Sequence, residues 1–197
     1  MFLCIDTTTS ESGITLTGYG YLPLDPQYAS EEIIQTIDKL IKKAGIELSQ
    51  IEGVYVIKGP GSFTGLRVGI AVANQFSHQL KIPIIGLKTD EWWKNKTDEE
   101  DFVYLQTMNK SEIYMDGKII PIENLSGDKK WIGQLSENHL SKLPSGFTQI
   151  TNLLSPEETW NKVALKTISS KLKAYELVEP YYGKEPMITK SKKKLSI

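Results

Sequence analysis

The stretch KGPGSFTGLRVGIAVA, residues 58–73, holds the strongest structural signal in the chain. A short apolar run rich in β-branched residues, VYVI at 54–57, precedes it and predicts a buried strand. The glycine-rich turn that follows leads into a periodic segment from about Thr64 to Leu80, which predicts a helix. A strand, a glycine turn and a helix N-terminus can together bind an anion through backbone N–H groups. The candidate residues for such a site are Gly59, Gly61, Ser62 and Thr64.

The turn does not match the two common phosphate-binding loops. A Walker A loop needs Gly-Lys-Ser/Thr at its end, but Gly65 is followed by Leu66 and Arg67. A dinucleotide fingerprint needs G-x-G-x-x-G, whereas Gly59, Gly61 and Gly65 give G-x-G-x-x-x-G. Pro60 also removes one N–H donor from the turn. A dinucleotide-binding oxidoreductase therefore stays only as an alternative.

Small residues recur at every fourth position of the predicted helix, at Gly65, Gly69, Ala73 and Ser77. A glycine in a helix interior is unfavourable by about 1 kcal/mol relative to alanine. Such a stripe is typical of a helix that another backbone approaches closely. Two interpretations follow from the spacing: the helix packs on the protein's own sheet, or a partner helix docks along the stripe.

Arg67 is the only arginine, since the other basic residues are all lysines. A planar guanidinium can hold a carboxylate or phosphate with two parallel hydrogen bonds, which lysine cannot do. A cation is unfavourable at a helix N-terminus because of the helix dipole. We therefore expect Arg67 to reach away from the helix toward an acidic group, in a structural or subunit-contact role.

Residues 1–87 are predicted to form a first lobe. The patterns give the order strand, strand, strand, helix, strand, helix, strand, so that an antiparallel opening leads into a βαβ crossover. This order predicts the α/β class with a mixed sheet. The predicted elements are a strand at 2–6, two strands within 13–24, a helix with apolar residues from 33 to 44, a strand at 54–57, a helix at 64–80 and a strand at 82–87.

Residues 88–197 are predicted to form a second, smaller α/β lobe that ends in a basic tail, KSKKK at 190–194. Strands are expected at 102–106, 112–115 and 118–122, with a hairpin turn at Asp116-Gly117. Ser155, Pro156 and Glu158 form a capping box that starts a helix running to about Leu172. The tail is read either as a solvated end or as a contact for tRNA phosphates.

Bulk properties narrow the function classes. The chain has 197 residues, 40% of them hydrophobic and 24% charged, and a formal net charge of -1. The net charge argues against a protein whose main function is to bind nucleic acid through a basic face. A single cysteine, Cys4, excludes an internal disulfide and favours a reducing compartment. No run approaches the roughly 20 apolar residues of a membrane span, so we expect a cytoplasmic protein.

With these residues in hand, the chain resembles the TsaB (YeaZ) family. GPGSFTGLRVGIAVA is similar to the hallmark of that family, and FLCIDTTTS is similar to its opening strand and first phosphate-type loop. The segments IIQTIDKLIKKAGI, IPIIGL and EPYYGKEP follow in the family's order. The resemblance is strong over about residues 1–90. It implies a two-lobed actin-like ATPase (ASKHA, ribonuclease H-like) fold with a reduced second lobe.

The resemblance also implies a function. Members of the family take part in making threonylcarbamoyl-adenosine in tRNAs that read codons starting with A, as a subunit that carries no chemistry itself. The implied partners are a TsaD-like transferase and a TsaE-like ATPase, with tRNA contacted indirectly, and self-association of the free protein is left open. ATP and Mg²⁺ then act at the level of the complex, with no cofactor bound by this chain. The pairing surface implied is the two helices of the first lobe, and the candidate docking residues are Gly65, Arg67, Gly69, Ala73, Ser77, Ile33 and Ile37.

Asp6, Thr7 and Thr8 would form the vestigial phosphate loop. Asp6 could hold Mg²⁺ with phosphate oxygens, or it could simply bond the threonine turn that follows it. The second lobe departs from the family, because MNKSEIY at 108–114 has Asn109 where an aspartate is usual, and the chain has no Gly-Gly dipeptide. An actin-like ATPase or kinase is therefore the second alternative. The two histidines, His78 and His139, lack metal-site spacing, and no G-x-S-x-G elbow is present, so we expect no metal site and no peptidase.

Overall fold

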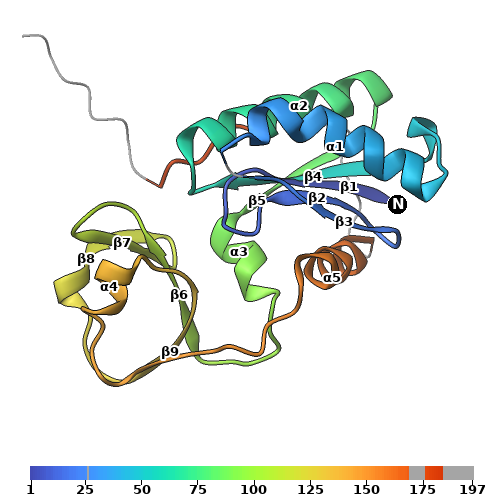
Figure 1. Cartoon of the computed structure of the whole chain (residues 1–197). Coiled ribbons are helices and arrows are strands. Elements are labelled where there is room, and N and C mark those ends of the chain that lie inside the picture. Colours follow the sequence, from blue (N-terminus) through green and yellow to red (C-terminus); the bar gives the residue numbers. More distant parts are fainter. Residues whose placement is uncertain (26, 169–175, 184–197) are drawn as a thin grey trace, which may run out of the picture.

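The computed structural model describes residues 1–25, 27–168 and 176–183. It contains two five-stranded sheets, each the centre of one lobe (Figure 1). The first sheet has the strand order β3-β2-β1-β4-β5, and the second has the order β10-β9-β6-β7-β8. The α/β class, the mixed first sheet and the two-lobed form are thus confirmed.

The first sheet joins an antiparallel half to a parallel half. β1 pairs antiparallel with β2, which pairs antiparallel with β3, while β1, β4 and β5 run parallel. The predicted order of elements is confirmed, with small changes at the ends. The bounds are β1 Phe2–Asp6, β2 Gly13–Leu16, β3 Gly20–Pro23, α1 Ala29–Ala44, β4 Gly53–Gly59, α2 Phe63–Leu80 and β5 Ile84–Lys88, with a short 3-10 helix at Leu48–Gln50.

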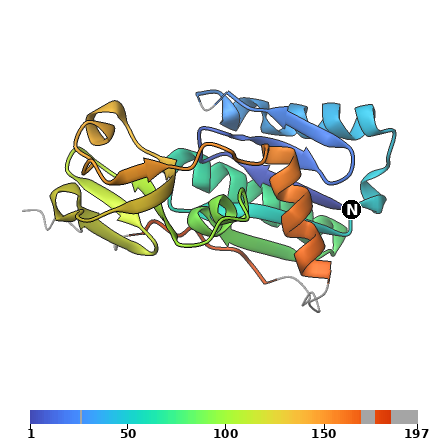
Figure 2. The same ribbon diagram turned by 90° about the horizontal axis from the view of Figure 1, so that it is seen from below.

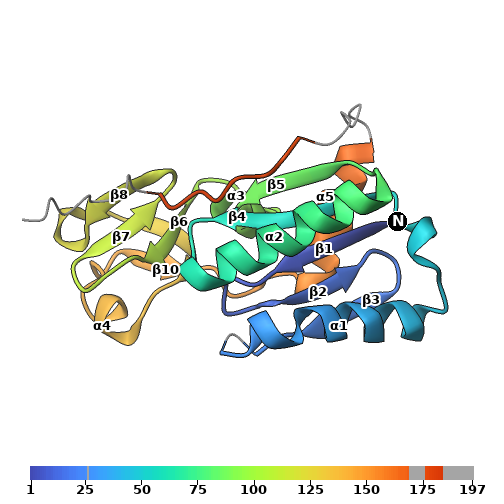
Figure 3. The ribbon, with the colours of Figure 1, turned by 90° about the horizontal axis from the view of Figure 1, so that it is seen from above.

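Helices cover both faces of this sheet. α1 and α2 lie side by side on one face (Figures 1 and 3), and α3 (Thr89–Lys94) and α5 (Pro156–Ile168) cover the other (Figure 2). Successive strand residues point to opposite faces. Leu3 and Ile5 of β1 therefore join the core under α1 and α2, whereas Phe2 and Cys4 join the core that contains α3 and α5.

The local signals at the helix ends account for where α1 and α2 stop and start. Gly45 takes a left-handed conformation (φ 66°) after α1, and the Ser62 side chain accepts a hydrogen bond from the Gly65 backbone N–H at the start of α2. α1 begins at Ala29, before the apolar stripe starts at Ile33. None of the helices among the described residues is long and apolar enough to cross a membrane.

The second sheet was only partly predicted. The strands β6 Phe102–Thr107, β7 Glu112–Met115 and β8 Lys118–Pro121 were expected, and Asp116 (φ 43°) and Gly117 (φ 94°) form the expected hairpin turn. Three elements went unpredicted, because each is short and lacks a clear period. They are β9 Lys129–Gln134, β10 Phe147–Gln149 and the single-turn α4 Glu137–Leu140, with a further 3-10 helix at Ile122–Asn124.

The predicted lobe boundary needs correction. The chain does not stay in the second lobe after residue 88, because α3, α5 and the segment 176–182 pack on the first sheet. The capping box at Ser155 and Glu158 is confirmed, with Ser155 N–H donating to Glu158 Oε2 at 2.9 Å and Glu158 N–H to Ser155 Oγ at 3.3 Å. The second lobe proper is therefore the sheet between residues 102 and 149. The predicted helix end at Leu172 and the KSKKK tail lie outside the described residues.

An aromatic core joins the two lobes. Tyr55 of β4 lies 6.0 Å from Trp160 of α5, measured between ring centroids, and Trp160 lies 5.7 Å from Trp92 of α3. Trp93 continues the cluster to Tyr104 on β6 at 6.2 Å. Because both sheets contribute to one buried cluster, the lobes are held in a fixed relation at their base.

Candidate functional site

The glycine turn is filled by the protein's own β1–β2 loop. A Cβ at Gly65 would overlap the carbonyl oxygen of Thr7, and one at Gly61 would lie 2.8 Å from the Cβ of Thr8. Thr7 Oγ1 donates a hydrogen bond to the Gly65 carbonyl at 2.6 Å. The glycines therefore allow the first loop to pack directly on the start of α2.

The other turn residues have separate places. Gly59 has φ 113°, and a Cβ there would overlap the carbonyl oxygen of Tyr181. Ser62 caps α2, and Thr64 is exposed on its first turn. The predicted anion-binding residues thus lie near one another, but the backbone space around Gly59, Gly61 and Gly65 is occupied by protein.

Asp6 is fully buried at the end of β1 and bonds the threonine turn. Its Oδ1 accepts hydrogen bonds from the Thr8 N–H at 2.8 Å, the Thr8 hydroxyl at 3.0 Å and the Thr9 N–H at 3.2 Å. Its Oδ2 accepts one from the Thr9 hydroxyl at 2.5 Å. Burial raises the pKa of Asp6 above its ordinary value, against the opposing effect of these four hydrogen bonds. Both carboxylate oxygens are engaged, so the residue fits a turn-capping role better than a Mg²⁺ ligand.

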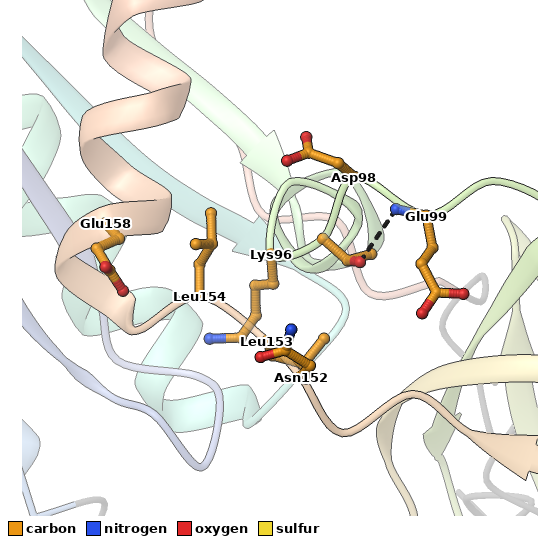
Figure 4. A pocket seen from close by; sticks show the side chains of 8 residues that line it. Lys96, Asp98, Glu99, Asn152, Leu153, Leu154 and Glu158 are labelled. Atoms are coloured by element: carbon orange, nitrogen blue, oxygen red, sulfur yellow. Dashed lines mark hydrogen bonds between the residues drawn. The ribbon is translucent and has the colours of Figure 1, made fainter.

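Next to this loop, Lys96 forms a buried ion pair. Its side chain is 2% exposed, its Nζ lies 2.6 Å from Glu11 Oε2, and it stands over the rings of Trp92 (4.8 Å) and Trp93 (5.2 Å). Lys96 lines one side of a polar hollow of about 560 Å³ between α5 and the two segments that link the lobes (Figure 4). Figure 4 shows Glu158 of α5 at one side of this hollow and Asp98 and Glu99 at the other.

No cluster of three or more His, Cys, Asp or Glu side chains among the described residues could hold a metal ion. His78 lies exposed near the end of α2, whereas His139 is buried in the second lobe and its Nδ1 lies 2.7 Å from Ser136 Oγ. Burial lowers the pKa of His139 below its ordinary value.

The small-residue stripe of α2 faces the protein's own interior, which corrects the expectation that it is a docking seat. Gly69, Ala73 and Ser77 are buried, and a Cβ at Gly69 would overlap Thr7 Oγ1. Ser77 Oγ donates to the Ile82 carbonyl at 2.6 Å. The stripe therefore lets α2 lie close on β1 and its loop. The same correction applies to two residues of α1, since Ile33 and Ile37 are buried in the core below the helix.

The opposite, exposed face of α2 is almost free of charge. Arg67, Ala71 and Gln75 follow one another at four-residue spacing along it, and Phe63 stands at its start with 55% of its surface exposed. Arg67 and His78 are the only ionisable residues in all of α2. A solvent-facing helix usually carries charged side chains there. α1 fits that rule, since its exposed positions include Glu31, Glu32, Asp38, Lys39, Lys42 and Lys43.

Arg67 does not pair with an acidic group in the described parts of the chain, contrary to our expectation. Its guanidinium carbon lies 3.9 Å from the centre of the Phe63 ring, and its Nε donates to the Tyr182 hydroxyl at 3.3 Å. Phe63 and Tyr182 are themselves 5.3 Å apart between ring centroids. Arg67 thus stacks on the Phe63 ring and donates to the Tyr182 hydroxyl at the molecular surface.

The partner of Arg67 belongs to a segment that sequence reasoning missed. Residues 176–183, called the strap here, run beside β5 and past the start of α2 (Figure 3). The Asn74 side chain bonds both the N–H and the C=O of Val178, each at 3.0 Å, and Tyr181 N–H donates to the Lys58 carbonyl at 2.6 Å. EPYYGKEP was noted in the sequence for its place in the family's order, but nothing local in it indicated this contact.

Comparison with known proteins agrees with this architecture. A family model described as tRNA N6-adenosine threonylcarbamoyltransferase (TsaD) matches residues 7–101. A solved structure of YeaZ from Pseudomonas aeruginosa superposes with a TM-score of 0.72 at 17% identity, over 92% of this chain and 98% of that one. A second, described as an uncharacterized protein with similarity to peptidase YEAZ from the same organism, gives 0.74 at 17% identity, over 93% and 99%.

Among curated relatives, the tRNA threonylcarbamoyladenosine biosynthesis protein TsaB of Escherichia coli K12 is 31% identical over 91 residues, which are 44% of this chain and 39% of that protein. The protein of the same name from Buchnera aphidicola of Acyrthosiphon pisum is 29% identical over 114 residues, 56% of this chain and 49% of that protein. The chain thus spans less than half the length of each of these relatives.

The two sheets, the helices on both faces of the first and the loop packed on the start of α2 define a two-lobed protein of the actin-like ATPase fold. In its first loop, between β1 and β2, both oxygens of the Asp6 carboxylate accept hydrogen bonds from Thr8 and Thr9. Within that class, the chain is similar in sequence and in structure to proteins of the TsaB/YeaZ family.

Proposed function

We propose that this chain serves in the biosynthesis of threonylcarbamoyladenosine in tRNA, as a subunit that carries no chemistry of its own and docks onto a TsaD-like transferase. The names of its relatives and the family model support the pathway. The docking surface is the outer face of α2 together with the neighbouring part of α1, in place of the buried stripe.

The observation that carries this proposal is the charge-poor outer face of α2. Burial of a surface in a protein interface favours positions without charge, since each charge must lose its water. Phe63 and Ile34 are large apolar side chains with 55% and 53% of their surface exposed on α2 and α1. Val68, Val72 and Phe76 lie partly exposed along α2. A partner helix laid against this face would cover them.

The first loop supports the non-catalytic part of the proposal. An ATPase of this fold would need the Asp6 carboxylate for a metal ion, whereas both of its oxygens already accept hydrogen bonds from Thr8 and Thr9. ATP and Mg²⁺ then act elsewhere in the assembly, with a TsaE-like ATPase as the third component. tRNA is contacted through the transferase.

The experiment is an affinity measurement between this chain and the TsaD-like transferase of the same organism. Ala71→Glu places a charge at the middle of the proposed face and should lower the affinity about tenfold or more, while leaving thermal unfolding unchanged. Gln149→Glu is the matched control, because it adds the same charge at an exposed position of β10 in the second lobe. Unchanged binding by Ala71→Glu would refute the surface, and absence of binding by the wild-type chain would refute the proposed partner.

A further inference from the structure

The start of α2 and the strap together build one small surface patch, defined as Phe63, Arg67 and Tyr182. Phe63 and Arg67 are neighbours on α2 whereas Tyr182 lies 115 positions after Arg67, yet the two rings and the guanidinium are in mutual contact. Stacking on Phe63 and the hydrogen bond to Tyr182 favour one orientation of the guanidinium. Much of the side-chain entropy that a free arginine would lose on binding a ligand is therefore already lost.

Among the described residues, most of the hydrogen-bonding capacity of Arg67 is unused. A guanidinium has five N–H donors, and only the Nε donor meets a partner, Tyr182, within the described residues. The two terminal nitrogens carry the donors that bind a carboxylate or phosphate in a fork. No carboxylate lies within ion-pair distance of Arg67 in the described parts of the chain.

The strap is what places Tyr182 in the patch. Asn74 holds Val178 through two hydrogen bonds, and Lys58 holds Tyr181 through its carbonyl. A Cβ at Gly86 would lie 2.7 Å from Val178, so β5 also leaves room for the strap. The ammonium of Lys88 lies 5.1 Å from the centre of the Tyr181 ring, which adds positive potential beside the patch.

We propose that the patch formed by Phe63, Arg67 and Tyr182 recognises a carboxylate side chain of the docking partner, and that the strap is the element that completes it. This inference rests on the proposed function and names the chemistry at one end of that interface. The ligand is a protein carboxylate because the adjoining face of α2 carries no further cation up to His78, whereas an RNA backbone needs several cations along its path. Aromatic residues and arginine are also the side chains that most often anchor protein interfaces.

The test measures the affinity of the full-length chain for the TsaD-like transferase by calorimetry at low and moderate salt. Arg67→Ala should raise the Kd about tenfold or more, and Arg67→Lys should raise it nearly as much, because the fork and the stacking are lost in both. Asn74→Ala, which changes no patch side chain but releases the strap that positions Tyr182, should also raise it severalfold. Lys129→Ala, which removes an exposed cation from the second lobe, is the control and should bind normally.

The outcomes separate the two proposals. If the wild-type chain does not bind the transferase, both the proposed function and the patch are refuted. If it binds, but Arg67→Ala and Arg67→Lys bind equally well, only the patch is refuted. If Arg67→Ala weakens binding and Arg67→Lys does not, the site requires only a positive charge and not a planar guanidinium. The proposed forked contact with a carboxylate would then be wrong. Should binding require added tRNA and fall with Arg67→Ala only then, the ligand is a phosphate and the carboxylate assignment is overturned.

Discussion

The side-chain amide of Asn74 on α2 holds the backbone of Val178, accepting a hydrogen bond from its N–H at 3.0 Å and donating one to its C=O at 3.0 Å. One side chain thus pairs both backbone groups of Val178, as a neighbouring strand would do in a sheet. Because these two bonds join residues 104 positions apart, they fix the end of the described chain to the helix that we propose as the docking surface.

Asn74→Ala should loosen the strap without unfolding the protein. Each of the two hydrogen bonds stabilises the attached strap by about 0.5–1.5 kcal/mol. Without them, the amides of Val178 and Tyr181 should exchange with solvent about tenfold faster or more. Amide hydrogen exchange measures this directly. Gln75→Ala changes the adjacent, exposed residue and is the matched control. Equal protection of the strap in both variants would contradict the role of Asn74.

Gly65→Ala should destabilise the fold more than Gly69→Ala. The added methyl group meets the backbone oxygen of Thr7 at the first position, whereas at the second it meets the rotatable Thr7 hydroxyl. Over-packing of this kind typically destabilises by about 1–3 kcal/mol, and Gly69→Ala also gains roughly 1 kcal/mol of helix propensity. Urea unfolding would give both free energies. Ala71→Gln, on the exposed face of the same helix, should change stability by less than about 0.5 kcal/mol, and a Gly65→Ala variant as stable as this control would show the close packing to be wrong.

The Lys96–Glu11 pair should respond unequally to loss of each partner. Lys96 is 2% exposed whereas Glu11 is 28% exposed, so a lone Glu11 can regain water but a lone Lys96 cannot. Breaking a buried pair by removing one partner can destabilise by about 3–5 kcal/mol. We expect Glu11→Gln to approach that range and Lys96→Met to fall clearly below it.

The double variant Glu11→Gln, Lys96→Met completes this comparison. It should be about as stable as Lys96→Met alone, because no buried charge is left without a partner. Thermal unfolding of the three variants and the wild-type protein gives the four stabilities of this double-mutant cycle. A double variant as unstable as the sum of the two single variants would mean that the two charges do not interact.

His139 should make stability depend on pH near neutrality. Burial lowers its pKa below the ordinary value of 6.5. The unfolded chain therefore binds a proton at higher pH than the folded chain does, so this residue's contribution to stability is complete above about pH 6.5 and declines as the pH falls toward the lowered pKa. The free energy of unfolding should rise with pH across that window.

His139→Asn should remove this rise, since its side-chain oxygen can accept from Ser136 but cannot titrate. Chemical unfolding at a series of pH values, read as the difference between variant and wild type, isolates the effect from other groups. His78→Asn, at an exposed position of α2, should keep the wild-type slope. The interpretation would be wrong if the slope survived in His139→Asn.

The fold of the first lobe could be predicted because its signals are local. The strand VYVI, the glycine turn and the period of α2 lie within about thirty residues, and the Ser155 capping box lies within four. The spacing of Gly65, Gly69 and Ala73 predicted a close approach of two backbones, but not which two, since a helix face looks the same in sequence whether its neighbour is its own loop or another protein. The surface that we propose instead shows in the sequence as an absence of charge between Arg67 and His78.

Other features could not be read from the sequence for physical reasons. The contact of Asn74 with Val178 and that of Lys96 with Glu11 join residues 104 and 85 positions apart, and neither pair has a local pattern. The stacking of Arg67 on Phe63 is different, because the two are four residues apart on a helix and side chains at that spacing meet. That contact was available to sequence reasoning and was missed.

The chain leaves the first sheet after α3 and comes back to it at α5, and its outgoing and returning segments touch where the Leu154 N–H donates to the Lys96 carbonyl at 2.8 Å. Residues 97–153 are therefore an insertion in the first lobe, and the two segments that flank the insertion lie next to each other. A second lobe of different size could be inserted between these two segments without moving either part of the first lobe. The second sheet can therefore vary while α1 and α2, which we propose as the docking surface, keep their positions.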